Sequence, residues 1–272
     1  MLVPARRVAC DNARLATPAS FRMTNSVVVN QPVAIPSLQD AESQRLAARM
    51  AELARSMAAC PGIDDFAATG WLPDAFFDAL AKLYATYDQY VEHNIAASEL
   101  KIVCKFGCTR CCHQAVHGCY AFEIINLYRQ LRPRADYGQI HDDFVRSADE
   151  FQAMFARYQE KSPGRDDVAL VNTLQHFSAI AKPCPLLGGN NCRVYAHRPV
   201  SCRMYHSLTN PVLCTTVLGR TFHVVPPDEV AAILADLNDR LAFPYSEFLA
   251  EGLVRFANAR QFRPWGAPLP RA

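Results

Sequence analysis

Seven of the eleven cysteines in this 272-residue chain lie in two short segments, which we call the first cysteine segment (104–112) and the second cysteine segment (184–202). Packing preference does not explain four thiols within nine residues, and a long chain without an apolar signal segment near its start does not favour persistent disulfides. Thiols this close can converge as soft ligands for zinc or iron. The predicted metal ligands are Cys104, Cys108, Cys111, Cys112, Cys184, Cys192 and Cys202.

Both cysteine segments lie in stretches that contain no acidic residue, from Lys101 to Phe122 and from Val168 to Pro227. Nearby positive charge lowers the pKa of a thiol and offsets the negative charge of several thiolates. A nucleic-acid surface is disfavoured, because the net charge is only +2 and no basic–aromatic motif accompanies the arginines. We therefore expect three arginines to lie beside the thiolates and to tune a bound cofactor: Arg193, Arg198 and Arg203.

The spacing of the first cysteine segment limits how it can hold a metal. On one straight helix its four thiols would face one way but span about 12 Å, whereas thiolates on one zinc lie about 4 Å apart. Either the chain turns at Gly107, or the four cysteines serve a polynuclear cluster or more than one site. The adjacent pair Cys111 and Cys112 slightly favours the second interpretation, because neighbouring thiols rarely both reach one tetrahedral ion.

The second cysteine segment is predicted to be a loop. Prolines flank Cys184, and the Gly-Gly-Asn-Asn run at 188–191 is a strong turn signal that can fold Cys192 back toward it. Pro199 suits the first position of a helix. We expect Cys202 in the first turn of that helix, where amide donors stabilise a thiolate.

The two segments together resemble a known family over roughly residues 100–206. The order Cys-x3-Cys-x2-Cys-Cys, Cys-Pro-Leu, Cys-Arg-Val-Tyr, Arg-Pro and Cys-Arg is similar to the bacterial cysteine-cluster family of zinc- or iron-chelating proteins. It is similar, more loosely, to the iron–sulfur-containing lysine methylases of flagellin. The resemblance implies metal binding but no settled reaction.

Other cysteines and histidines are weaker candidates. Cys119 could complete a set of eight thiols but is expected to pack in the core, and Cys214 could be a ligand or a packed thiol. His113 could replace a cysteine ligand, although a surface or supporting position is expected. His117 and His206 rank lower, and Cys10 and Cys60 are expected to be free.

Elsewhere apolar residues recur every three or four positions, which is typical of amphipathic helices. With half of its residues hydrophobic, the chain can bury a core. We predict a mainly α fold, with a helical metal-binding domain at 39–260 and one short β-hairpin within 212–225. We expect a first helix that ends near residue 59 and a second that begins at residue 74. Further helices are expected at 122–131, 137–161, 167–181, 228–241 and 246–260.

Residues 1–38 are predicted to be a disordered N-terminal tail, and residues 261–272 a C-terminal tail. Met23 is a plausible start of translation. No stretch approaches about 18 uncharged apolar residues, so we expect no membrane partner and a cytoplasmic protein. No nucleotide-binding, phosphate-binding or hydrolase motif occurs. Whether the protein is an enzyme stays open.

Two functions compete at this point. In the first, an iron–sulfur cluster has a redox or protein-modifying role, with a protein or peptide substrate or a redox partner. In the second, zinc closes a loop-rich segment and the protein is an adaptor or interaction module without catalysis. Seven thiols exceed the four that a structural zinc needs, which favours the first.

Overall fold

The computed structural model describes residues 33–34, 40–98, 101–104, 107–210, 213–214, 221–241 and 246–260. The predicted tails, apart from residues 33–34, lie outside this described part. The fold is mainly helical, as predicted. Its helices are α1 (Ala41–Ala58), α2 (Phe66–Thr69), α3 (Asp74–Ala97), α4 (Ala121–Leu131), α5 (Tyr137–Lys161), α6 (Asp166–Ala179), α7 (Val200–Arg203), α8 (Asp228–Arg240) and α9 (Leu249–Arg260).

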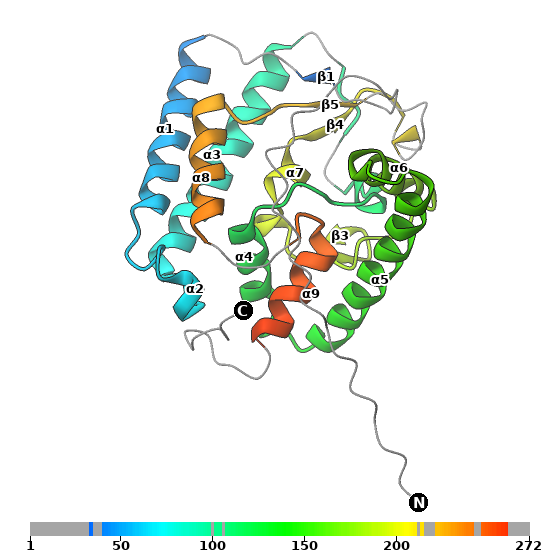
Figure 1. Ribbon diagram of the computed structural model, residues 1–272. Coiled ribbons are helices and arrows are strands. Elements are labelled where there is room, and N and C mark those ends of the chain that lie inside the picture. The colour runs from blue at the N-terminus through cyan, green and yellow to red at the C-terminus, as the bar shows by residue number, and fades with distance from the viewer. Residues whose placement is uncertain are drawn as a thin grey trace, which may run out of the picture.

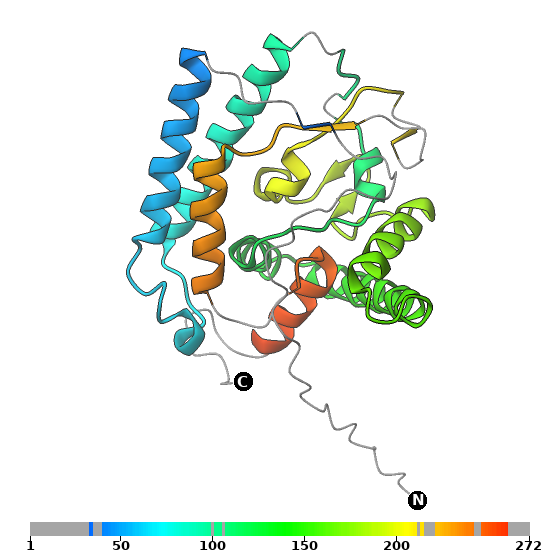
Figure 2. The same ribbon diagram turned by 45° about the horizontal axis from the view of Figure 1, so that its top comes forward.

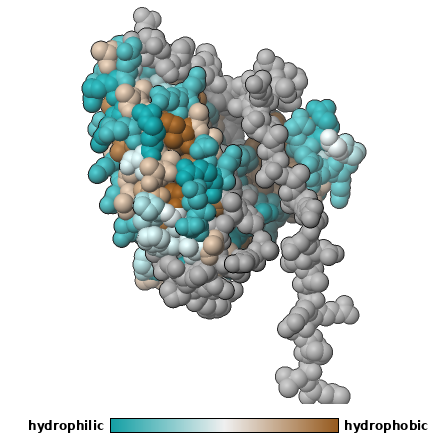
Figure 3. All heavy atoms as spheres, turned by 60° about the vertical axis from the view of Figure 1, so that its left-hand side comes forward, coloured by the Kyte–Doolittle hydropathy of each residue, from teal (hydrophilic) through white to brown (hydrophobic). Residues whose placement is uncertain are grey.

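The helices form two groups with the cysteine segments between them (Figures 1 and 2). Helix α1 packs against α3 and α8 on one side, and α5 packs against α6 and α9 on the other. Figure 3 brings the α1–α8 side forward and shows a mostly hydrophilic surface with smaller hydrophobic areas. No helix in the described ranges is long and apolar enough to cross a membrane.

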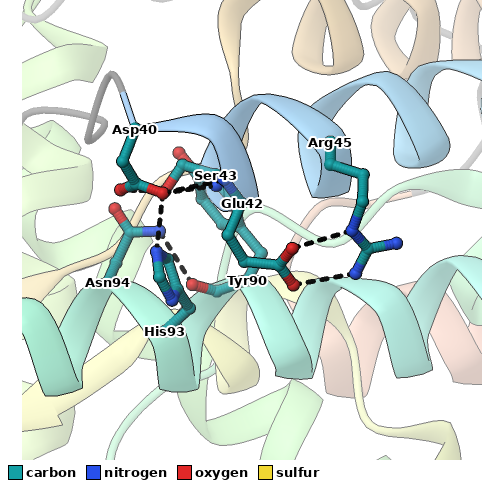
Figure 4. A network of polar contacts seen from close by, with 7 residues as sticks. All are labelled: Asp40, Glu42, Ser43, Arg45, Tyr90, His93 and Asn94. Carbon is teal, nitrogen blue, oxygen red and sulfur yellow. Dashed lines mark hydrogen bonds and ion pairs between the residues drawn. The ribbon is translucent and has the colours of Figure 1, made fainter.

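Helix α1 is fixed to α3 by a polar network at its start (Figure 4). The Asp40 carboxylate accepts the backbone N–H groups of Glu42 and Ser43, both at 2.9 Å, and so caps the helix. The same carboxylate lies 2.9 Å from His93 Nε2 on α3. The cap and the His93 contact together set where α1 begins relative to the end of α3.

Helix α4 lies at the centre of the core. Its residues 121–128 are all buried, which is the pattern of a helix surrounded by protein rather than of a surface helix. Helix α9 approaches it closely at Gly252, where an added Cβ would meet the Ser246 carbonyl oxygen at 2.4 Å and Ile124 Cδ1 at 3.1 Å. A side chain at that position would clash with the backbone at Ser246 and crowd Ile124 of α4.

The strands are short: β1 (Val33–Ala34), β2 (Leu187–Gly188), β3 (Asn191–Cys192), β4 (Tyr205–Ser207) and β5 (Thr221–His223). Strand β5 pairs in parallel with β1 and antiparallel with β4, so the three form one sheet in the order β1-β5-β4. Strands β2 and β3 form a separate antiparallel pair.

The prediction of a hairpin within 212–225 differs from the pairing seen in this sheet. A strand does form at Thr221–His223, but its antiparallel partner is Tyr205–Ser207, which precedes the predicted segment. The predicted tip, 218–220, lies outside the described residues. The pairing depends on tertiary contacts that a local turn signal does not contain, such as the stacking of His206 on Phe222 with ring centroids 5.3 Å apart.

Candidate metal centre

The first cysteine segment is not α-helical as far as it is described. Cys104 lies outside the helices and strands, and its Sγ accepts a hydrogen bond from the backbone N–H of Ser207 in β4 at 3.1 Å. The chain reverses at Gly107, whose φ of +84° is a conformation that favours glycine. Cys111 and Cys112 then follow in the 3₁₀ turn Arg110–His113. The turn at Gly107, one of the two alternatives, is therefore present.

The second cysteine segment folds back on itself as predicted. Leu187 pairs with Cys192 across the β2–β3 turn, so the glycine–asparagine run brings Cys192 back toward Cys184. The backbone N–H of Cys184 donates to the Cys112 carbonyl at 2.6 Å, which fastens this segment to the first. Residues far apart in sequence thus meet through a main-chain hydrogen bond.

Cys202 lies in the single turn of helix α7, as expected. Pro199 precedes the helix as its N-cap rather than occupying its first position, a shift of one residue. The N–H of Val200, the first helical residue, donates to Glu123 Oε1 at 2.8 Å. A buried carboxylate of α4 therefore holds the start of the helix that carries Cys202.

The thiols of both segments gather around Cys111. Burial first, and then neighbouring thiols that include Cys111, raise the pKa of Cys104 to about 11 and that of Cys184 to about 12. The pKa values of Cys192 and Cys202 are also raised, by burial first and with Cys111 among the further causes. Such mutual effects require the thiols to lie near one another.

The thiols that act on one another fall into two sets that share Cys111. Cys104 is influenced by Cys108 and Cys214, whereas Cys202 is influenced by Cys184 and Cys192. Cys111 raises the pKa in both sets, and its own pKa is raised first by Cys112 and then by burial. Cys111 therefore lies near thiols of both segments, whereas a single centre that uses all seven cysteines stays a prediction.

Arg203 is a structural centre of this region. Its side chain is only 2% exposed, and its guanidinium donates to the carbonyls of Arg198 at 2.9 Å and Ala196 at 2.6 Å. It also pairs with Asp88 of α3 and lies over the ring of Tyr84 at 4.3 Å. Arg203 thereby fixes the loop between β3 and α7 against α3.

Arg198 is the arginine most closely associated with the thiols. It lowers the pKa values of Cys111 and Cys192, in both cases against larger opposing effects of burial. One guanidinium nitrogen lies 3.5 Å from Asp88, and the guanidinium covers the Tyr195 ring at 4.0 Å. Its Nε is buried and has no hydrogen-bond partner among the described residues.

Arg193 takes a different position. Its Nη1 pairs with Asp136 at 2.7 Å, and its side chain lies against Gly188, where an added Cβ would meet Arg193 Cγ at 3.0 Å. Asp88 and Asp136 both lie outside the acid-free stretches. The local absence of acids in the sequence is therefore compensated in space by carboxylates from other elements.

Glu123 is a buried residue of the site that the sequence argument missed. Its two carboxylate oxygens accept hydrogen bonds from Tyr84 Oη at 3.0 Å, Val200 N at 2.8 Å and Tyr120 N at 3.1 Å. Burial raises its pKa despite these bonds. A signal was present, because Glu123 is the first acid after the first acid-free stretch and lies three residues after the N-cap of α4.

The weaker candidates have other contacts. Cys119 Sγ lies 3.8 Å from Ser201 Oγ, and Cys60 Sγ contacts the Ser56 carbonyl at 3.4 Å. Cys10 lies outside the described residues. The histidine contacts are His113 Nδ1 with the Thr109 carbonyl at 3.0 Å, His117 Nδ1 with Glu247 at 3.7 Å, and His206 Nδ1 with the Met204 carbonyl at 3.0 Å.

The donor set fits a soft metal, and the buried Nε–H of Arg198 is a spare donor for an anionic thiolate centre. The ligand geometry is less complete. Within the described ranges, no three Cys, His, Asp or Glu side chains already lie close enough together to hold an ion. The predicted ligands thus lie near one another, but their side chains are not arranged at metal–ligand bonding distances.

Comparison with known proteins identifies the region but not the whole chain. The family model CxxCxxCC, described as "Putative zinc- or iron-chelating domain", matches residues 103–218, which include all seven predicted ligands and Cys214. No curated protein and no solved structure matches the chain. The looser similarity to flagellin lysine methylases stays a prediction. Residues 103–218 are thus similar to the zinc- or iron-chelating domains that this family model describes, and the match supports metal binding by this region.

Proposed function

We propose that the metal bound by this domain is iron in an iron–sulfur cluster, with the seven cysteines of the two segments as its ligands. The observation that carries the proposal is the gathering of both segments around Cys111. A structural zinc needs four ligands, whereas the thiols here exceed that number. A cluster with several metals uses more thiolates and tolerates adjacent cysteines such as Cys111 and Cys112.

Such a cluster would supply electron transfer or activation of a substrate, and we propose a redox or protein-modifying role. The residues around it have separate tasks. The cysteines are partly shielded from water, Arg198 offsets negative charge beside Cys111 and Cys192, and Arg203 fixes the loop that carries Arg198. A protein or peptide substrate or a redox partner is proposed on the same grounds.

A second candidate is a structural zinc with no catalytic role. It is favoured by the small size of the elements in the second segment, a pair of two-residue strands and a four-residue helix, which bury little apolar surface of their own. A metal would stabilise such a segment directly.

Anaerobic purification followed by metal and sulfide analysis and visible absorption separates the two candidates. The iron–sulfur proposal expects iron and inorganic sulfide in similar amounts, with visible absorption that decreases on reduction. Zinc alone, with no sulfide and no visible absorption, would contradict it and favour the structural site.

A further inference from the structure

Exposed or partly exposed arginines lie together where the end of α4 meets the loop between β3 and α7. We call them the arginine surface: Arg129, Arg132, Arg134, Arg193 and Arg198. The two elements meet because α4 packs against the 3₁₀ turn Tyr195–His197 of that loop. Asp136 also joins them, since its carboxylate pairs with Arg134 at 2.8 Å and with Arg193 at 2.7 Å.

The arginine surface has fewer carboxylates than guanidinium groups. Among the described residues, the carboxylates paired with it belong to Asp74, Asp88 and Asp136. Asp88 also pairs with the buried Arg203, so six guanidinium groups share three paired carboxylates. The loop itself supplies no acid, because the sequence has none from Val168 to Pro227. Positive charge is therefore in excess at this surface.

Tyr195 adds an exposed aromatic ring to the arginine surface. It is 42% exposed, and among the exposed large apolar residues that the structure describes it is the one in the second cysteine segment. The guanidinium of Arg198 lies over its ring at 4.0 Å. Tyrosine and arginine are residue types that carry much of the binding energy in protein interfaces. This composition favours a surface that binds a partner over one that is only solvated.

Contacts within the protein hold these arginines in place. The backbone N–H of Arg193 donates to the Leu186 carbonyl at 2.8 Å. On α4, the Arg129 guanidinium lies over the Phe77 ring at 4.4 Å, and that of Arg132 over the Tyr137 ring at 5.4 Å. Side chains that are already ordered lose less conformational entropy when a partner binds.

The arginine surface borders the second cysteine segment. Arg193 directly follows Cys192, and Arg198 precedes Cys202 by four residues. A partner bound here would thus lie beside predicted ligands of the centre. The groups that already pair with these arginines are carboxylates, and a net charge of +2 is low for a nucleic-acid-binding protein. Both observations favour an acidic protein over a nucleic acid.

We propose that the arginine surface, with Tyr195 beside it, is the docking site of a protein partner that binds through a segment rich in Asp and Glu. The inference rests on the proposed function, in which the centre has a protein substrate or redox partner, but not on whether the metal is iron or zinc. Charge complementarity would speed the association and set the orientation of the partner.

Fluorescence anisotropy of a fluorescein-labelled oligoglutamate peptide tests the docking site on the full-length, metal-loaded protein. Labelled oligothymidylate of equal charge is the second probe. The test variant combines three changes at the end of α4: Arg129→Gln, Arg132→Gln and Arg134→Gln. The matched control removes the same charge from three exposed, ion-paired arginines of α1: Arg45→Gln, Arg49→Gln and Arg55→Gln.

The wild type should bind oligoglutamate more tightly than oligothymidylate, and added salt should weaken the binding. The α4 variant should raise the Kd for oligoglutamate at least about tenfold, the sum of three exposed charge contacts, and the α1 variant should change it little. Metal content and far-ultraviolet circular dichroism should match the wild type in both variants.

Arg193→Gln is a milder second variant in case the α4 variant folds poorly, because Arg134 still pairs with Asp136 in it. It should raise the Kd about threefold. Wild-type affinity in both variants, an equal loss in the α1 control, no oligoglutamate binding by the wild type, or oligothymidylate bound as tightly would each overturn the docking site.

Metal and sulfide analysis of the same samples separates this inference from the proposed function. Zinc without sulfide, together with a loss of peptide binding confined to the α4 variant and Arg193→Gln, would refute the iron–sulfur proposal and leave the docking site. Iron and sulfide without any such loss would refute the docking site alone.

Discussion

Arg198 has a guanidinium that acts on two predicted ligands and a buried Nε without a hydrogen-bond partner in the described part of the chain. Positive charge beside an anionic centre stabilises it and raises its reduction potential. Arg198→Gln should therefore lower metal retention or shift the potential downward, as measured by metal analysis and redox titration. Arg193→Gln is the control, because Arg193 pairs with Asp136.

Helix content should stay the same in both arginine variants, since neither residue lies in a long helix. If Arg198→Gln keeps wild-type metal content and potential, Arg198 does not tune the centre. Its contacts with Asp88 and Tyr195 would then be its main role.

Asp88 accepts contacts from both Arg198 and Arg203 although it belongs to α3, outside the family match. Asp88→Ala would leave Arg203 buried without its carboxylate. Hydrogen bonds to charged groups contribute about 2 kcal/mol, so the free energy of unfolding should fall by about that amount in urea denaturation. Asp78→Ala, at an exposed position of the same helix, should change it little, and equal effects of the two changes would contradict this role.

Asp40 should make the free energy of unfolding decrease at acid pH. The N–H of Ser43 first, and the His93 side chain further, hold the pKa of the Asp40 carboxyl below its ordinary value of 3.8. A carboxyl with a lowered pKa stabilises the fold above its unfolded pKa of about 3.9 and loses that contribution as the pH falls through the folded pKa. Below about pH 4, urea denaturation should therefore show a shallower loss of stability in Asp40→Asn than in the wild type.

Asp65→Asn is the matched control for Asp40→Asn. Asp65 precedes α2 at the corresponding position but makes no side-chain capping bond. An unchanged acid dependence in Asp40→Asn, or an equal change in Asp65→Asn, would show that the cap does not carry this effect.

Among the elements, we expect the two cysteine segments to depend on the metal for their order and the long helices not to depend on it. Helices α1, α3 and α5 bury apolar faces of their own, whereas the cysteine segments consist of turns and very short strands. Removing the metal should therefore increase hydrogen exchange at 100–120 and 182–205 and leave these helices protected. Equal protection with and without metal would mean that the cysteines are ordinary core residues.

Helix positions were the most predictable part of the molecule, because the spacing of apolar residues in one helix is a local property. Helix α5 has the predicted bounds, and α4 ends at Leu131 as expected. Helix α9 begins at Leu249 rather than at residue 246, and α2 was not predicted. Short or frayed helical turns have too few residues to show a period.

The contacts that assemble the site were much less predictable. The turn at 188–191 and the placement of Cys202 follow from local glycine, asparagine and proline signals. The partners Asp88, Asp136 and Glu123, and the pairing of β4 with β5, come from distant parts of the chain. A single sequence does not show which distant residues meet in the fold, so these partners could not be inferred.

For the molecule as a whole, the account is that helices on two sides hold a thiol centre assembled from two distant segments. X-ray absorption at the metal edge of the anaerobically purified protein tests this most directly. We predict sulfur neighbours at about 2.3 Å from the metal, together with a metal–metal distance if the centre is an iron–sulfur cluster. A metal surrounded by oxygen and nitrogen only would contradict the thiol centre.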